Sequence, residues 1–434
     1  MQYRVVAFLL FAALPGTVHA AITDGLAAQT GQTAAGGQYT QQFQEWMQRA
    51  QAGDARSQYN VALMYEGGFG VKQDFTEALR WYRLAAAQQH ADAERSLGLM
   101  LEFGRGVEHN PVEASRYYLL SAQHGNAKAA FNLGNCYRLG VGVERNDAEA
   151  VRWYLVAAEG GEIDGQVAVG VMYGLGRGVA RDIVEAVKWY RIAAEGGDAR
   201  AQFNLGLSHE RGDGVPQDFG AALRWYRAAA EQGDATGLRA VGVMYALGRG
   251  VTRDPGEAAR WYLMAAEKGD PIAQFNLAAA FETGRGVDLN QVQAVHWYRK
   301  AGEQGIANAQ YNLGVAYESG TMGVTKDLGE AVRWYGRAAD QGDVAAMVKV
   351  AGFYEAGVGV ERDLERAARW FGLAAGRGDL FALERLGDVL WAMGDFDDAR
   401  EAWRRAGGMT TEQAAVARLQ RKQDSGPEAA ATVN

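Results

Sequence analysis

Pairs of aromatic residues recur along this 434-residue chain at an almost constant interval. The interval is 36 residues throughout, apart from one of 37 between Trp297 and Trp334. The nine pairs are Trp81-Tyr82, Tyr117-Tyr118, Trp153-Tyr154, Trp189-Tyr190, Trp225-Tyr226, Trp261-Tyr262, Trp297-Tyr298, Trp334-Tyr335 and Trp370-Phe371. A period of this length is typical of a stack of short repeated units, so we expect one solenoid and not three globular domains.

Each repeat is predicted to contain two helices joined by a Gly-x-Gly-Val turn. In the first repeat we expect the first helix over residues 55–67, followed by the turn Gly68-Phe69-Gly70-Val71. The second helix is expected to begin seven residues before the aromatic pair, where every repeat has Asp or Asn. These short side chains can accept hydrogen bonds from the free N–H groups of the first helical turn. The nine cap positions are Asp74, Asn110, Asn146, Asp182, Asp218, Asp254, Asn290, Asp327 and Asp363.

Two further features of the second helix carry expectations. A Glu or Gln lies three residues after the cap in seven of the nine repeats, which predicts a capping box. The aromatic pair is expected to pack against the next repeat.

The composition agrees with this organisation, because the 57 glycines suit repeated turns and helix ends, and 6 prolines suit a mostly helical chain. The formal charge of −8 argues against a nucleic-acid partner, which usually needs a basic surface.

The N-terminal residues resemble a secretory signal. Arg4 precedes a short apolar run, and Val18-His19-Ala20 places small residues where a signal peptidase cleaves. The run is too short to span a bilayer, so we expect an exported chain, most simply periplasmic, with extracellular release as the alternative. The predicted organisation is a signal peptide (1–20), a flexible leader (21–39), an N-terminal capping helix (40–53), nine repeats (54–378), a terminal hairpin (379–408), a C-terminal capping helix (409–423) and a disordered tail (424–434).

The repeated motifs resemble those of the Sel1-like repeat family, which is related to the tetratricopeptide repeats. The residues that carry the resemblance are Leu97-Gly98, Gly104-x-Gly106-Val107, Glu149-Ala150-x-x-Trp153-Tyr154 and Ala157-Ala158-x-x-Gly161, together with their counterparts. The resemblance implies an all-α, right-handed superhelical solenoid of helical hairpins. It also implies a scaffold that binds proteins or peptides on its concave surface, in envelope assembly, signalling or host interaction. The hairpin after the ninth repeat lacks the Gly-x-Gly turn and resembles an ordinary tetratricopeptide hairpin.

One pair of positions in the first helix supplies the candidate binding residues. In tetratricopeptide relatives the matching asparagine bonds the backbone or carboxylate of a bound peptide, and an amide can both donate and accept. The alternative is that these asparagines bond between neighbouring helices. The candidates are Asn60, Asn132, Asn204, Asn276 and Asn312, with the aromatic residues Tyr59, Phe131, Phe203, Phe275 and Tyr311 that precede them.

Two sets of charged residues admit a structural and a functional interpretation. A basic residue precedes the aromatic pair in eight repeats, and in the six where a glutamate lies three residues earlier we expect the two to pair instead of forming a basic ladder. A glutamate near the end of the first helix could acidify a rim of the groove or simply face solvent. This second set is Glu66, Glu102, Glu210, Glu282, Glu318 and Glu355.

Signals for catalysis are weak. The chain has no His-Glu-x-x-His, Gly-x-Ser-x-Gly or Walker sequence, so we expect no enzyme activity, no metal and no cofactor. An alternative is a cell-wall protein that binds peptidoglycan or β-lactams, or has weak β-lactamase activity, as some cysteine-rich relatives do. Those relatives have paired cysteines in each repeat, whereas Cys136 is the only cysteine here and is expected to be buried. Envelope glycan is a second partner class.

Overall fold

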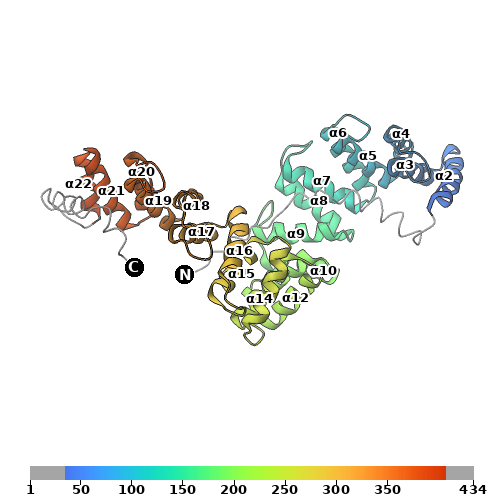
Figure 1. The fold of residues 1–434 in the computed structure, drawn as a ribbon. Coiled ribbons are helices and arrows are strands. Elements are labelled where there is room, and N and C mark those ends of the chain that lie inside the picture. The colour runs from blue at the N-terminus through green and yellow to red at the C-terminus, as the bar shows by residue number, and fades with distance from the viewer. Residues whose placement is uncertain (1–34, 407–434) are drawn as a thin grey trace. The chain divides into compact units, whose positions relative to one another are not determined.

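The computed structural model describes residues 35–406, and Figure 1 shows these residues as consecutive antiparallel helical hairpins. The described part of the chain contains no strand. An N-terminal helix, α2 (Ala35–Gln51), precedes the hairpins. The predicted signal peptide, most of the leader, the C-terminal capping helix and the tail lie outside the described residues.

Ten hairpins follow α2, and each consists of a first and a second helix. The first helices are α3 (Ala55–Gly67), α5 (Ala91–Phe103), α7 (Ala127–Leu139), α9 (Ile163–Leu175), α11 (Ala199–Arg211), α13 (Ala235–Leu247), α15 (Pro271–Thr283), α17 (Ala307–Ser319), α19 (Val344–Ala356) and α21 (Leu380–Met393). The second helices are α4 (Phe75–Ala86), α6 (Pro111–Gln123), α8 (Asp147–Glu159), α10 (Ile183–Glu195), α12 (Phe219–Glu231), α14 (Pro255–Glu267), α16 (Gln291–Glu303), α18 (Leu328–Asp340), α20 (Leu364–Gly376) and α22 (Phe396–Arg405).

The expected all-α solenoid of hairpins is therefore confirmed. The chain divides after Trp225 into two compact parts, which are described separately. In each part a helix packs against the helix before it and the helix after it. None of the described helices is long and apolar enough to cross a membrane.

The caps of the second helices form as predicted. Oδ1 of Asp74, for example, accepts hydrogen bonds from the backbone N–H groups of Thr76 and Glu77 at 2.9 and 3.0 Å. The other eight Asp and Asn caps likewise accept a bond from the first turn of their helix. The first helices end at glycines with positive φ, such as Gly140 (φ 73°), which glycine adopts at little cost.

The predicted capping box is wrong. The backbone N–H of the cap residue Asp74 donates to the carbonyl of Tyr65 in the preceding helix at 2.9 Å. The carboxylate of Glu77 therefore cannot accept a hydrogen bond from this N–H, as a capping box requires. The other eight caps make the same bond. Glu77 pairs instead with Arg80 at 3.0 Å, as expected for the basic residues that precede the aromatic pairs. The equivalent pairs are Arg152–Glu149, Lys188–Glu185, Arg260–Glu257 and Arg333–Glu330.

The second aromatic residue of the pair packs closely on the first helix of its own repeat, and Tyr335 also contacts Phe353 of the next repeat, as expected. The ring of Tyr118 lies so close to Gly98 that a Cβ added there would be 2.5 Å from it. Gly134 and Tyr154 repeat this contact. Each of these tyrosine side chains is fully buried. The Leu-Gly motif therefore makes room for the second-helix tyrosine of the same hairpin.

The interval of 37 residues is explained by one extra residue in a turn. Met322 lies between Gly320 and Gly323 and has a φ of 58°, which is uncommon for a residue with a side chain. Its side chain is buried, with 7% of its surface exposed. The helices on both sides, α17 and α18, keep the 13-residue length of their counterparts, so the turn alone absorbs the insertion.

Candidate functional site

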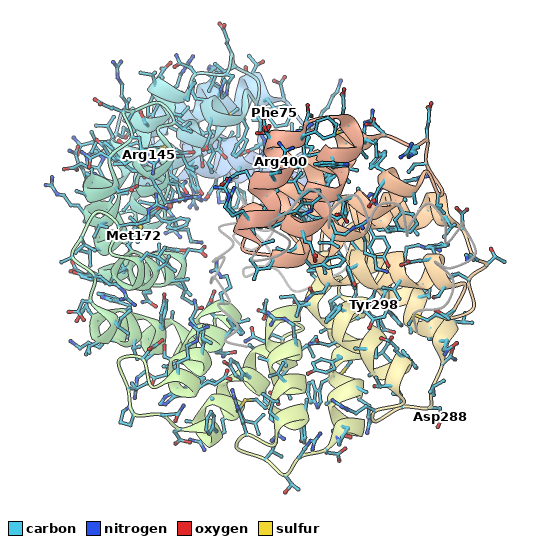
Figure 2. The ribbon with its side chains drawn as sticks, turned by 90° about the vertical axis from the view of Figure 1, so that its left-hand side faces the viewer. Phe75, Arg145, Met172, Asp288, Tyr298 and Arg400 are labelled. Carbon is cyan, nitrogen blue, oxygen red and sulfur yellow. The ribbon has the colours of Figure 1, made fainter. Side chains whose placement is uncertain are left out.

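Four of the six glutamates near the ends of the first helices accept a hydrogen bond from a tyrosine of their own repeat. Oε2 of Glu66 accepts a hydrogen bond of 2.6 Å from the hydroxyl of Tyr82, the second-helix tyrosine of the same repeat. The same bond joins Tyr298 to Glu282 at 2.5 Å and Tyr335 to Glu318 at 2.6 Å, and also joins Tyr118 to Glu102. Both interpretations made from the sequence are corrected, because in these repeats the carboxylate is a structural acceptor for a buried phenol. Figure 2 shows Tyr298 among the helices and Asp288 on the outer turn between α15 and α16.

The candidate aromatic residues pack on the second-helix tyrosines. The ring centres of Tyr59 and Tyr82 are 5.8 Å apart, and Tyr59 also stacks on His90 at 4.8 Å. Phe131 and Phe275 lie 5.7 and 5.6 Å from the tyrosines of their repeats. Tyr311 lies 5.3 Å from Tyr335 in the same way. Phe203 is half-buried like the others. These rings therefore support the hairpin, with part of each ring left exposed.

The candidate asparagines differ in their surroundings. Asn312 hydrogen bonds to the hydroxyl of Tyr298 in the preceding repeat, which matches the alternative of bonding between helices. Asn60, Asn132 and Asn276 are half-buried, and their side-chain amides have no hydrogen-bond partner among the described residues. Asn204 is more buried, with 8% of its surface exposed. Three of the five amides are thus accessible and can still bond to a ligand.

A row of exposed apolar side chains lies on three consecutive first helices, and on α7 it shares a helix face with Asn132. Leu139 follows Asn132 by seven residues, which is two helical turns, so both lie on one face of α7. The same position holds Phe103 in α5 and Leu175 in α9. The exposed fractions of Phe103, Leu139 and Leu175 are 53%, 57% and 45%. Three consecutive first helices therefore present a large apolar residue at one register, where a soluble surface would be expected to vary.

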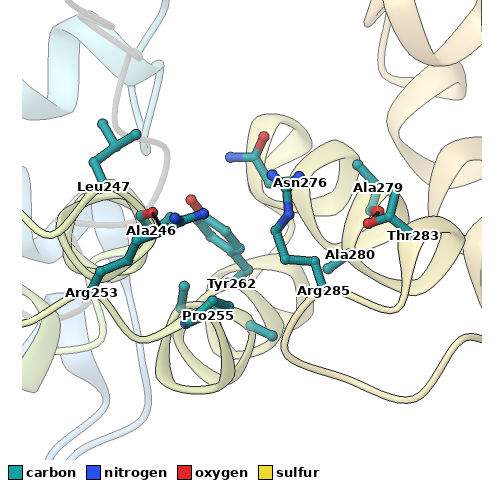
Figure 3. Close-up of a pocket in the computed structure, with 12 residues that line it drawn as sticks. Ala246, Leu247, Arg253, Pro255, Tyr262, Asn276, Ala279, Ala280, Thr283 and Arg285 are labelled. Atoms are coloured by element: carbon teal, nitrogen blue, oxygen red, sulfur yellow. Dashed lines mark hydrogen bonds between the residues drawn. The ribbon is translucent and has the colours of Figure 1, made fainter.

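The second part of the chain contains a hollow of about 520 Å³ between α13, α14 and α15. Asn276, Tyr262 and Arg285 converge on it from three elements, as Figure 3 shows. Burial raises the pKa of Tyr262 to about 12, and the nearby Arg239 partly opposes that rise. The complete lining is Ala246, Leu247, Arg253, Pro255, Ala258, Ala259, Tyr262, Asn276, Ala279, Ala280, Thr283 and Arg285.

The repeat motifs do not indicate this hollow, but the sequence of α15 does. Most first helices have large residues in the middle of their last two turns, such as Leu99 and Met100, whereas α15 has Ala279 and Ala280. Removing this bulk from a closely packed helix pair leaves space. Of the ten predicted site residues, only Asn276 lies in the hollow. Among residues 35–406 no cluster of three His, Cys, Asp or Glu side chains could hold a metal ion.

The repeats match the family model of the Sel1 repeat nine times in succession. The matched residues are 55–90, 91–126, 127–162, 163–198, 199–234, 235–270, 271–306, 307–343 and 344–379. The chain belongs to the Sel1-repeat family. The resemblance inferred from the motifs is thereby confirmed, and the Sel1-repeat chain is a helical scaffold of a kind that typically mediates interactions between proteins.

Solved structures of other Sel1-repeat proteins are similar to this chain. One is a protective antigen present in uropathogenic Escherichia coli strains that displays an SLR fold. It is 36% identical, with a TM-score of 0.67, over 84% of this chain and 79% of that one. Another is a Sel1-repeat protein from Oxalobacter formigenes, 30% identical with a TM-score of 0.58, over 75% of this chain and 97% of that one. No curated protein sequence matches this chain.

Proposed function

We propose that this Sel1-repeat chain is an exported, non-enzymatic scaffold that binds a partner protein on the surface of its first helices. The observation that carries the proposal is the face shared by Asn132 and Leu139. On this face of α7 an amide without a hydrogen-bond partner lies beside an exposed apolar side chain, and the neighbouring helices α5 and α9 present Phe103 and Leu175 at the register of Leu139. A peptide backbone needs both donors and acceptors, and its side chains gain from apolar contact, so the combination suits a polypeptide.

Export is part of the proposal. The features of residues 1–20 support it, because a short apolar run followed by a small-residue cleavage site is typical of a secretory signal. Similarity to a protective antigen of E. coli supports a role at the cell envelope or toward a host. The periplasm is the proposed compartment. Fractionation of the producing cells, with cleavage checked by N-terminal sequencing, tests this component on its own.

The alternative of a penicillin-binding or β-lactamase function has little to rest on. The single thiol, Cys136, is buried with 5% of its surface exposed, and burial raises its pKa to about 12. A thiol in this state is a poor nucleophile, because the reactive species is the thiolate. No carboxylate lines the hollow between α13 and α15.

The binding surface can be tested by capture of partners from envelope extracts. Leu139→Asp places a charge in the apolar row and should abolish capture of the partner seen with the unchanged protein. Val184→Asp is a matched control, because Val184 is also exposed (54%) but lies on the second helix α10. The double substitution Asn204→Ala with Asn276→Ala should weaken capture without changing helicity. Equal capture by all variants would place the site elsewhere.

A further inference from the structure

The first repeat shows what normally fills the position of the hollow. Glu66 accepts the hydrogen bond of Tyr82 through one carboxylate oxygen, and its other oxygen lies 3.7 Å from Arg105 in the turn of the next repeat. One carboxylate therefore joins a buried phenol of one repeat to an arginine of the next. Because the side chain of Glu66 is only 9% exposed, these two partners are what make its charge tolerable there.

At the sixth repeat the chain keeps the tyrosine, and the next repeat keeps the arginine, but the carboxylate is missing. The residues at the register positions of Tyr82 and Arg105 are Tyr262 and Arg285, but the position of Glu66 is taken by Ala246. Tyr262, at 8% exposed, has no hydrogen-bond partner for its hydroxyl, and Arg285 has no ion-pair partner among the described residues. A single Glu-to-Ala difference between repeats thus leaves a donor and a cation facing an empty space.

A second carboxylate that could have neutralised the turn arginine is also missing. In the fourth repeat Arg177 pairs with Asp147, the first residue of the preceding second helix, at 3.1 Å. The corresponding first residue for Arg285 is Pro255, which cannot pair. Arg285 is therefore deprived of both acidic partners that turn arginines have elsewhere in this chain.

The remaining groups around the hollow are positive or neutral. Arg253 bonds through Nε to the carbonyl of Ala246 at 3.2 Å and has no carboxylate partner. The amide of Asn276 is unpartnered and lies beside Arg285 in Figure 3. The remaining walls are mostly alanine, leucine and proline, which suit the methylene groups of an incoming side chain. Two cations and two neutral donors with no lining carboxylate favour an anion.

We infer that this hollow binds a glutamate side chain of an acidic partner segment, which takes the place that Glu66 occupies in the first repeat. The partner's carboxylate accepts a hydrogen bond from the hydroxyl of Tyr262 and pairs with Arg285. Asn276 is placed to bond the adjoining peptide group. This inference rests on the proposed function, since it specifies the chemistry of the protein partner at one point of the first-helix surface.

The test uses a fluorescent hexaglutamate peptide with an amidated C-terminus, and follows its binding to the purified protein by fluorescence anisotropy. Ala246→Glu supplies the missing carboxylate from the chain itself, so it should close the site and weaken hexaglutamate binding about tenfold or more. Gly174→Glu is the matched control. Gly174 has the same register position in the fourth repeat, but the residue that corresponds to Arg285 there is Asp213. The control should bind as the unchanged protein does.

The results of this binding test distinguish between the possible ligands of the hollow. Undiminished binding by Ala246→Glu, or equal loss in both variants, would overturn the inference, since the second result reports only general charge repulsion. If the protein binds a hexaglutamine peptide with a free C-terminus more tightly than amidated hexaglutamate, the ligand group is a terminal carboxylate. If it binds only polygalacturonate, the ligand is an acidic glycan. Both results overturn the assignment to a glutamate side chain.

A second variant keeps the test informative if the first one misfolds. If Ala246→Glu changes helicity, Arg285→Gln serves in its place, with Arg177→Gln as its control, and unchanged binding by Arg285→Gln overturns the inference. Failure of this inference can be distinguished from failure of the proposed function. If hexaglutamate does not bind the unchanged protein, but partner capture is still abolished by Leu139→Asp, the scaffold proposal stands and the occupant proposed for the hollow is wrong.

Discussion

The hydroxyl of Tyr82 and the carboxylate of Glu66 form a 2.6 Å hydrogen bond between residues sixteen positions apart. Both groups are buried, with the tyrosine fully enclosed and the glutamate 8% exposed. The bond joins the end of the first helix to the middle of the second and so fixes how the two helices of a hairpin meet. Each buried polar group satisfies the other, which is the condition for either to be tolerated in the core.

Removing the hydroxyl should therefore destabilise the first repeat. Tyr82→Phe leaves the buried carboxylate of Glu66 without its closest donor, and the expected loss is about 1.5–3 kcal/mol, as for hydrogen bonds to charged groups. Tyr190→Phe is the control, because the hydroxyl of Tyr190 has no hydrogen-bond partner among the described residues. Hydrogen exchange of the backbone amides of α3 and α4 measures the loss locally, which suits a repeat protein whose unfolding need not be two-state. Equal effects of the two substitutions would contradict this interpretation.

The sequence predicted this architecture well because its signals are local and repeated. The Asp and Asn caps follow from positions one to three residues away, and Asp74 behaves as its pattern indicates. The capping box failed for a non-local reason: the N–H of Asp74 is taken by Tyr65, on the other helix of the hairpin. A sequence pattern for a helix start does not include what the previous helix offers.

The candidate site was predictable only in part. The asparagine register was found by resemblance, but which amides remain free depends on tertiary neighbours, as the bond from Asn312 to Tyr298 shows. The role of Glu66 required knowing that the tyrosine sixteen residues later turns back toward it. The hollow lacks the carboxylate that Glu66 provides in the first repeat, because Ala246 occupies that position. The consequence of this difference can be recognised only once the contacts of Glu66 are known.

Buried tyrosines should make the fold sensitive to alkali. Burial raises the pKa of Tyr59 and of Tyr154 to about 12, against an ordinary value of 10.0. The folded chain retains these protons where the unfolded chain loses them. Stability should thus be complete below pH 10 and decline as the pH rises from 10 toward 12, by about 1.4 kcal/mol per pH unit for each such tyrosine.

Phenolate absorbance and helicity, followed through the same alkaline titration, check this prediction. The slow rise in phenolate should coincide with the loss of helix, because the buried hydroxyls ionise as the repeats open. Ionisation of all tyrosines near pH 10 with the helices intact would contradict the burial described here. Tyr154→Phe should shift the helix transition to higher pH, since it removes one group that drives unfolding.

Cys136 should be unreactive in the folded protein. Its thiol is buried and lies near the carboxylate of Glu102, and burial followed by this charge raises its pKa. Little thiolate is available near neutral pH, so alkylation by iodoacetamide should be slow until denaturant is added. Val184→Cys supplies an exposed thiol for comparison, and mass spectrometry counts the alkyl groups. Rapid modification of Cys136 without denaturant would show that the α7–α8 hairpin opens readily.

The second glycine of the Gly-x-Gly turn should be the least replaceable residue of a repeat. Gly142 has a φ of 72°, and a Cβ there would lie 2.0 Å from the carbonyl oxygen of Pro111, at the start of the preceding second helix. Gly142→Ala thus combines an unfavourable backbone conformation with a clash between repeats, and should cost about 2 kcal/mol or more. Gly161→Ala separates the two effects, because Gly161 has a φ of 85° but nothing within 4 Å of its Cβ position. The control should lose about 1–2 kcal/mol, the backbone contribution alone. Guanidinium unfolding followed by helicity compares the two variants, and equal losses would show that the turn does not set the contact between successive repeats.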